Sequence, residues 1–326
     1  SFKRSQVYKN SEGVDTPDNR DFRNIFSTGP RMRTSLDQLT DLQLSVDYIQ
    51  TEIDDEDTSD TKRVKSNSTV YRRVGPVSSI GLSGEYLSIL DGDGSEEYDD
   101  WGVSLLYKRQ FVRGELSAKA GVGEVLRENG EDESTQFYSF SFAKELFFHD
   151  VKLTYVRDVT DTSYGNADDP ETSAGTDPAF DIIFLTNNDL STNDVLIEDT
   201  FKFNLSRQFA KYNYRVGGFY TKQNYVSFAR NEKNYGVSVV MDRKFTSKFV
   251  AGISLAREST RLEDLSELET FYEDTYKING RYALTRTLSG TIFVQYETRN
   301  GSDSISHDFD EMSGGIRVDW RTNLHL

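Results

Sequence analysis

The stretch Trp101-Gly102-Val103-Ser104-Leu105-Leu106-Tyr107-Lys108 carries a large apolar or aromatic side chain at every odd position. The same alternation runs through Tyr235-Gly236-Val237-Ser238-Val239-Val240-Met241-Asp242. A period of two places alternate side chains on opposite faces of a β-strand. The sequence therefore predicts strands with one apolar face and one polar face.

Tight turns recur along the chain at residues 36–40, 75–77, 110–114, 147–150, 209–212, 245–248 and 285–288. Most successive turns lie roughly 35 to 40 residues apart, a period that solenoids and propellers can also have. Each unit, however, contains a long strand, a polar loop, a second long strand and a short turn. This is the hairpin unit of an up-and-down membrane barrel.

We expect an all-β fold, a transmembrane antiparallel up-and-down β-barrel of about sixteen strands, with fourteen to eighteen possible. The expected strands are 2–10, 22–36, 41–53, 62–74, 78–90, 97–109, 114–127, 134–146, 150–162, 196–208, 212–226, 233–244, 248–260, 270–284, 288–300 and 306–320. The whole chain, 1–326, is expected to be one outer-membrane domain with a long loop insertion at about 164–195.

The composition agrees with a thin apolar outer band and a polar interior. The net charge is 38 − 54 = −16, only 36% of residues are hydrophobic, and 13% are aromatic. Disorder is the first competing interpretation, but aromatic residues are too frequent and too regularly placed for it. A soluble sandwich also alternates. The length of the strands, the strict alternation of short turns with long polar loops, and the aromatic residues beside the short turns favour a membrane barrel.

Motifs for catalysis or metal binding are lacking in the sequence. It contains no cysteine, and His149, His307 and His325 have no metal-ligand spacing. The acidic segments 54–57 and 91–97 contain many carboxylates, but 91–97 departs from a calcium-loop pattern, so we interpret both as solvated loops. An outer-membrane hydrolase built on His149 or His307 is the enzymatic alternative, and no motif places its third residue. We therefore expect no enzyme, no metal and no cofactor.

Basic side chains at the polar positions of the strands are the candidate functional residues. Rings of charge in a lumen select solutes, while cross-strand ion pairs simply satisfy a polar wall; both interpretations stay open. The lumen-facing candidates are Lys108, Lys119, Lys152, Lys202, Arg215, Lys277, Arg281 and Arg317.

The long loop holds the most apolar stretch outside the strands, Ala179-Phe180-Asp181-Ile182-Ile183-Phe184-Leu185. Exposing an apolar run of this length to water is unfavourable, so we expect another surface to cover it. One hypothesis is that the loop narrows the channel, with Phe180, Ile182 and Phe184 at the constriction. The other is a hairpin extension that stands above the membrane.

Some hairpins resemble a known group of proteins. The relevant segments are 200–208 followed by 212–220, the turn Phe245-Thr246-Ser247-Lys248-Phe249, and Leu284-Thr285-Arg286-Thr287-Leu288-Ser289-Gly290. They resemble the outer-membrane β-barrel proteins encoded with exopolysaccharide biosynthesis and exosortase-type systems, over most of the chain from about residue 40. The resemblance implies export of a secreted polysaccharide with periplasmic partner proteins. It supplies no catalytic motif.

The sequence thus predicts a bacterial outer-membrane conduit for a secreted polysaccharide, with outer-membrane lipid and lipopolysaccharide, the polysaccharide and periplasmic export components as partners. A scaffold barrel that encloses a partner complex and a general diffusion porin are the alternatives. Nucleic acid is not an expected partner, because no aromatic and basic platform projects from a soluble face.

Overall fold

The computed structural model describes residues 2–8, 20–53, 61–91, 98–127, 132–161, 195–225, 231–263, 268–285, 287–301 and 308–320. Every regular element in these ranges is a β-strand. No helix in the same ranges is long and apolar enough to cross a membrane.

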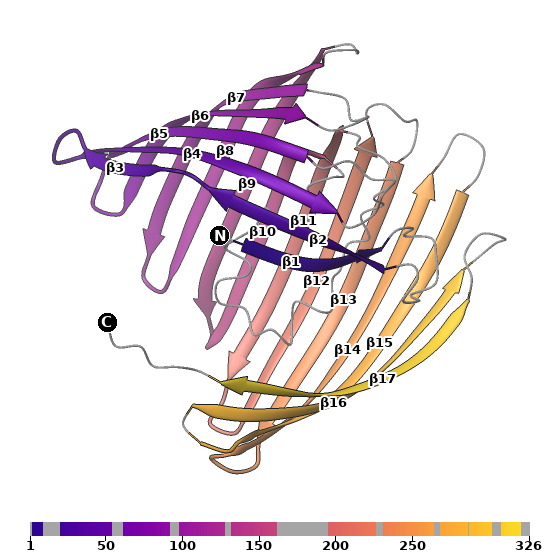
Figure 1. The fold of residues 1–326 in the computed structure, drawn as a ribbon. Coiled ribbons are helices and arrows are strands. Elements are labelled where there is room, and N and C mark those ends of the chain that lie inside the picture. Colours follow the sequence, from indigo (N-terminus) through magenta and orange to yellow (C-terminus); the bar gives the residue numbers. More distant parts are fainter. Residues whose placement is uncertain are drawn as a thin grey trace. The chain divides into compact units, whose positions relative to one another are not determined.

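The strands follow one another in chain order (Figure 1). Their bounds are β1 Phe2–Tyr8, β2 Arg20–Thr28, β3 Arg31–Ser35, β4 Thr40–Ile53, β5 Thr61–Arg73, β6 Ser78–Asp91, β7 Tyr98–Phe111, β8 Gly114–Arg127, β9 Glu133–Leu146, β10 His149–Asp161, β11 Val195–Gln208, β12 Tyr212–Tyr225, β13 Asn231–Lys244, β14 Phe249–Glu263, β15 Leu268–Ala283, β16 Leu288–Gly301 and β17 Phe309–Trp320.

Strands β2 and β3 are one strand interrupted at Gly29-Pro30. Both pair with β4, and the register is the same on either side of the break. Pro30 has no N–H to donate to the ladder, but its carbonyl still accepts a hydrogen bond from Val46 N at 3.1 Å. A Cβ on Gly29 would lie 1.8 Å from Val46 O, so the neighbouring backbone leaves room only for glycine there. Counted in this way, the described residues form sixteen strands, and the predicted fold class is confirmed.

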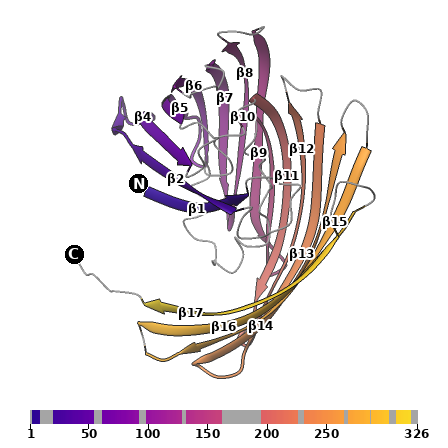
Figure 2. The same ribbon diagram turned by 45° about the vertical axis from the view of Figure 1, so that its right-hand side comes forward.

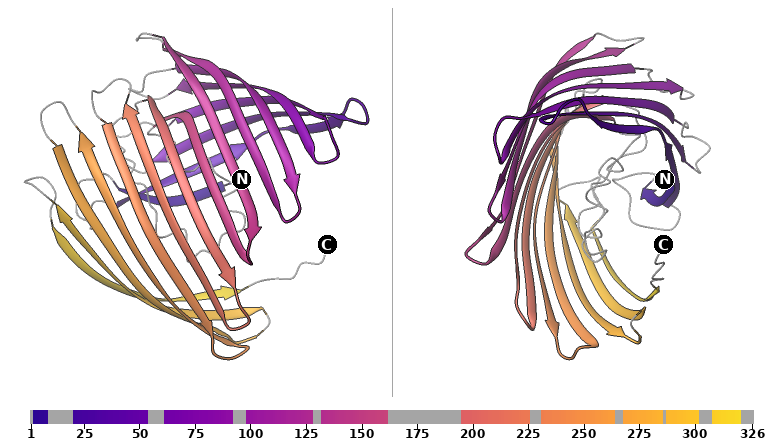
Figure 3. Two further views of the ribbon diagram at one scale, coloured as in Figure 1. Left: turned by 180° about the vertical axis from the view of Figure 1, so that it is seen from behind. Right: turned by 90° about the vertical axis from the view of Figure 1, so that its left-hand side faces the viewer.

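Neighbouring strands pair antiparallel, each with the next in the sequence. In one compact unit (Ser1–Lys144, Thr154–Thr200 and Gln223–Asn231) this order runs from β4 through β9, the strands drawn side by side in Figure 3. In the other unit (Glu145–Leu153, Phe201–Lys222 and Glu232–Leu326) it runs from β14 through β17, visible in Figure 2. This is the up-and-down connectivity of outer-membrane barrels.

Short turns are held by side chains as well as by the ladder. The Asp37 carboxylate accepts hydrogen bonds from Leu39 N at 2.6 Å and from the Thr40 hydroxyl at 3.0 Å. Thr246 Oγ1 accepts from Lys248 N at 3.2 Å and Phe249 N at 2.9 Å. Asp and Thr side chains that accept backbone N–H groups two or three residues later close turns in this way. The predicted turns 36–40 and 245–248 are therefore determined by local chemistry.

The turn between β9 and β10 has an unusual backbone. Phe147 and Phe148 have φ angles of 51° and 70°, in the left-handed region. Positive φ at both central positions is the geometry of a two-residue type I′ hairpin turn, which normally carries Asn-Gly. The phenylalanines are 91% and 73% exposed. Two bulky, largely exposed residues therefore occupy a strained turn tip.

Candidate functional site

One face of the strands is apolar and open. On β7 the exposed side chains Trp101, Val103 and Leu105 alternate with the buried Gly102 and Ser104. Tyr276 and Ile278 of β15 repeat this arrangement, with Ile278 66% exposed. An apolar face that recurs along strand after strand is stable against lipid rather than against water. The chain is therefore a β-barrel protein of the bacterial outer membrane.

The opposite face of the strands is polar. Ser83, Ser104, Ser238 and Ser254 are among its buried side chains, and each lies on a position that alternates with the apolar one. By this alternation the eight basic candidates all belong to the polar face: Lys108 of β7, Lys119 of β8, Lys152 of β10, Lys202 of β11, Arg215 of β12, Lys277 and Arg281 of β15, and Arg317 of β17. The structure thus separates these residues from the lipid-exposed side chains.

Aromatic rings on the polar face lie over glycines of neighbouring strands. Gly102 and Gly123 are paired directly across β7 and β8. A Cβ on either would lie 2.6 Å or 2.4 Å from Cε2 of Phe137, a residue of β9 that is only 6% exposed. The two glycines therefore form a slot that the Phe137 ring fills.

A lysine ammonium lies close to two of these rings. Lys119 Nζ is 5.8 Å from the centre of the Phe137 ring, and Lys277 Nζ is 4.8 Å from that of Phe293, whose ring in turn covers Gly315. The negative face of an aromatic ring attracts a cation at such distances. The aromatic ring thus contacts both a glycine and a lysine, and this contact restrains the lysine chain.

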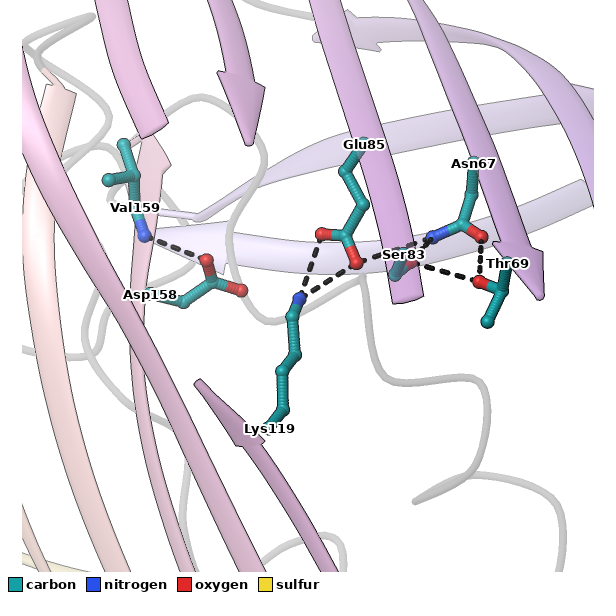
Figure 4. A network of polar contacts seen from close by, with 7 residues as sticks. All are labelled: Asn67, Thr69, Ser83, Glu85, Lys119, Asp158 and Val159. Atoms are coloured by element: carbon teal, nitrogen blue, oxygen red, sulfur yellow. Dashed lines mark hydrogen bonds and ion pairs between the residues drawn. The ribbon is translucent and has the colours of Figure 1, made fainter. Parts of the chain in front are cut away.

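Lys119 is also the cation of an ion pair across three strands (Figure 4). Its Nζ donates to the two carboxylate oxygens of Glu85 at 2.7 and 2.9 Å. Asn67 Nδ2 donates to the same carboxylate at 3.3 Å, and Thr69 Oγ1 lies 2.9 Å from Ser83 Oγ. Asn67, Thr69, Ser83, Glu85 and Lys119, which we call the Lys119 network, combine charges with amide and hydroxyl groups on neighbouring strands.

Two further carboxylates extend this region. Figure 4 shows Asp158 on the opposite side of Lys119 from Thr69, and Asp158 Oδ1 accepts a hydrogen bond from Val159 N at 3.0 Å. Asp100 Oδ1 is buried and has no hydrogen-bond partner among the described residues. The region therefore holds acid as well as base, and the lysine is not a free positive charge.

In the other compact unit several basic residues are paired as well. Arg317 Nε donates to Asp319 Oδ1 at 2.8 Å, and Arg299 forms an ion pair with Glu273 while its guanidinium lies 4.9 Å from the centre of the Phe271 ring. Lys152 and Lys202, by contrast, are exposed. The polar face thus carries both paired and accessible cations.

Other sequence-based candidates fall elsewhere. Phe180, Ile182 and Phe184, the acidic segments 54–57 and 92–97, and His307 lie outside the described residues. His149 lies at the start of β10, where its Nδ1 is 3.0 Å from Phe147 O and its ring is 6.0 Å from that of Tyr214. In the ranges that the structure describes, no three His, Asp or Glu side chains are arranged to hold a metal ion.

Sequence reasoning selected Lys119 but missed its partners. Glu85, Asn67 and Ser83 share the polar parity of their strands with the basic candidates, which was an available signal. Their contact depends on the register between β5, β6 and β8, which alternation within one strand does not determine. The glycines beneath the aromatic rings were missed for the same reason.

Comparisons with known proteins found similar folds only. No protein-family model and no curated protein matches the chain. A solved structure of the copper transporter OprC has a TM-score of 0.48 at 9% identity, over 93% of this chain and 65% of that one. A loop L8 deletion mutant of OmpT, an outer-membrane protein of Vibrio cholerae, has a TM-score of 0.38 at 8% identity, over 97% and 99% of the two chains. The outer-membrane transporter YddB of Escherichia coli has 0.42 at 8%, over 88% and 56%.

None of these likenesses reaches a TM-score of 0.5, and this chain spans about two thirds or less of the OprC and YddB chains. What the chain does must therefore be inferred from its own residues.

Proposed function

We propose that this chain is an outer-membrane conduit whose polar strand face lines a hydrated lumen, and that the solute it passes is a secreted polysaccharide. The Lys119 network is the observation that carries the proposal. It offers donors and acceptors on neighbouring strands, while the Glu85 carboxylate offsets the charge of Lys119.

A polar polymer needs weak contacts at many sites. Conduction requires binding that is favourable enough for a solute to enter and weak enough for it to leave. Hydroxyls of a sugar chain can exchange hydrogen bonds with the half-buried Asn67 and Glu85, and no strong net charge holds the polymer in place. The paired charges of Arg317 and Asp319 extend the same chemistry to another strand.

Accessible cations near the short turns favour an acidic sugar polymer over a neutral one. Lys108 lies three residues before the end of β7 at Phe111, and Lys152 lies three residues after the start of β10 at His149. Both are exposed on the polar face. Exposed lysines attract acidic groups over the range of about 8 Å that physiological salt leaves unscreened.

Single-channel conductance of the purified full-length chain in a planar bilayer tests the proposal. We expect a stable open channel that an acidic polysaccharide such as alginate blocks at lower concentration than neutral dextran of similar size. The variant Lys108→Gln/Lys152→Gln should lose that preference. Arg257→Gln, which removes an outward-facing charge from β14, is the matched control. An open channel that neither polymer blocks would leave a general porin and overturn the polysaccharide assignment.

A barrel that encloses a partner is the second candidate. Its supporting observation is that parts of the polar face are packed by the chain itself rather than open to water: Thr51 and Ser238 are each 1% exposed, and neither hydroxyl has a hydrogen-bond partner among the described residues. A water-filled lumen would wet such groups. A purified protein that inserts but does not conduct would support this candidate over the open conduit.

A further inference from the structure

The strands that end at short turns carry a repeated Arg-x-Phe segment. It occurs as Arg109-Gln110-Phe111 at the end of β7, as Arg207-Gln208-Phe209 at the end of β11, and as Arg243-Lys244-Phe245 at the end of β13. Residues two apart on a strand lie on the same face. Accordingly each guanidinium carbon lies over the phenylalanine that follows it, at 5.3, 4.2 and 4.8 Å from the ring centre. We call these three pairs the Arg-x-Phe stacks.

Arg207 and Arg243 each contact a second ring in the same compact unit. Arg207 Cζ is 5.8 Å from the centre of the Phe148 ring, and Arg243 Cζ is 5.3 Å from that of Tyr212. Contact with two aromatic rings restrains the planar guanidinium and leaves N–H groups available at its edge. In the other unit Lys144 Nζ lies 5.7 Å from the Phe111 ring, which adds a second cation to that stack.

The stacks belong to the apolar, lipid-exposed face. Arg243 shares strand parity with Val239 and Met241, which are 45% and 47% exposed, and Arg109 shares it with Leu105. An arginine in the hydrocarbon region would be costly, whereas at the membrane surface its charge meets headgroups and its stem meets acyl chains. Aromatic rings gather at this depth as well.

Two of the three arginines have no ion pair within the described ranges. No carboxylate among the described residues forms an ion pair with Arg207 or Arg243. Arg257 provides the contrast, because it also faces outward and lies over a ring, that of Tyr272 at 5.5 Å, yet Asp274 Oδ1 is 3.4 Å from its Nε. On a chain with a formal charge of −16, unpaired outward cations at the short turns call for an external anion.

We propose that the Arg-x-Phe stacks bind the phosphate groups of anionic phospholipids in the leaflet beside the short turns. The ring holds one face of the guanidinium, so that the N–H edge is free to donate two parallel hydrogen bonds to phosphate oxygens. An anionic headgroup is favoured over a zwitterionic one because the latter brings its own cation to the phosphate. This proposal does not depend on whether the barrel conducts.

Native mass spectrometry of the full chain in non-ionic detergent provides the test, with phosphatidylglycerol or phosphatidylcholine of identical acyl chains as the probe. We expect wild-type protein to retain phosphatidylglycerol in preference to phosphatidylcholine. Arg207→Gln/Arg243→Gln should weaken that binding by roughly fivefold for each arginine. Arg257→Gln, the matched control with a paired arginine, should bind phosphatidylglycerol as wild type does.

Equal retention of the two lipids by the wild-type protein would overturn the proposal, and this outcome does not depend on any variant folding. Loss of phosphatidylglycerol binding to the same extent in Arg257→Gln would overturn it too, since the effect would then follow total charge.

Discussion

Replacing Gly102 by alanine tests whether the Phe137 ring is fixed in its slot. The added Cβ would lie 2.6 Å from Cε2 of Phe137, and its next two neighbours, at 3.3 Å, are atoms of the same ring. Ordinary van der Waals contact begins at about 3.5 Å between carbon atoms. Because Phe137 is 6% exposed, its ring cannot rotate freely out of the way.

The expected loss of unfolding free energy is about 1–3 kcal/mol, the usual range when a packed interior must accept an additional methyl group. The ring is the only group that the methyl would meet closely, so Phe137→Ala should abolish the effect of the alanine. In the double-mutant cycle of Gly102→Ala and Phe137→Ala we therefore expect a coupling free energy of about the same size.

Urea unfolding of the protein in detergent micelles, followed by tryptophan fluorescence, measures these free energies. Gly84→Ala is the control, because no atom lies within 4 Å of the position of its Cβ. It should change stability by less than about 0.5 kcal/mol. If Gly102→Ala is as stable as Gly84→Ala, the inference that the Phe137 ring packs tightly against Gly102 is wrong. It is also wrong if Phe137→Ala leaves the loss of unfolding free energy unchanged.

Three short turns give further predictions, each checked by unfolding in detergent. Replacing Phe147-Phe148 by Asn-Gly removes left-handed strain of about 1–2 kcal/mol per residue and should raise stability by about 1 kcal/mol after the lost ring contacts; a decrease would contradict the turn geometry. Thr246→Val leaves two backbone N–H groups without their acceptor and should cost about 1 kcal/mol, whereas Thr246→Ser should retain stability. A hydrogen bond from Leu39 N, and to a smaller extent one from Thr40, lowers the pKa of the Asp37 carboxyl. The ionised carboxylate therefore stabilises the folded protein above its ordinary pKa of 3.8, and this stabilisation is lost as the pH falls through the lower pKa of the folded state. Asp37→Asn should therefore reduce stability at pH 7 and approach wild type in acid; a pH-independent difference would refute this assignment.

The strands could be predicted because their signals are local. The expected strand 114–127 coincides with β8, and 134–146 differs from β9 by one residue. Alternation within a strand and the Asp, Thr and Gly residues of the turns are properties of neighbouring positions. The interruption at Gly29-Pro30, inside the expected strand 22–36, follows from the missing N–H of proline, a signal that was present in the sequence but was not used.

For the candidate site, the sequence predicted only which face of its strand each residue occupies, and not which residues contact one another. Parity places Lys119 on the polar side, but its partner Glu85 lies on a strand that is not its immediate neighbour, since β7 runs between β6 and β8. Contacts across an intervening strand depend on two registers at once, and no single-strand pattern contains that information. The Arg-x-Phe stacks are the opposite case. Their spacing of two residues was visible in the sequence, and its meaning emerged only from the distances.

Side-chain closure of the short turns also bears on how the chain can change length over evolution. Thr246 closes the β13–β14 hairpin from within its own turn, where Phe245 N also donates to Phe249 O at 3.0 Å. When each hairpin carries the residues that define its own alignment, duplication or deletion of one hairpin leaves the alignment of the others intact. The chain is in this sense modular, and relatives that differ by two strands are the expected products of such events.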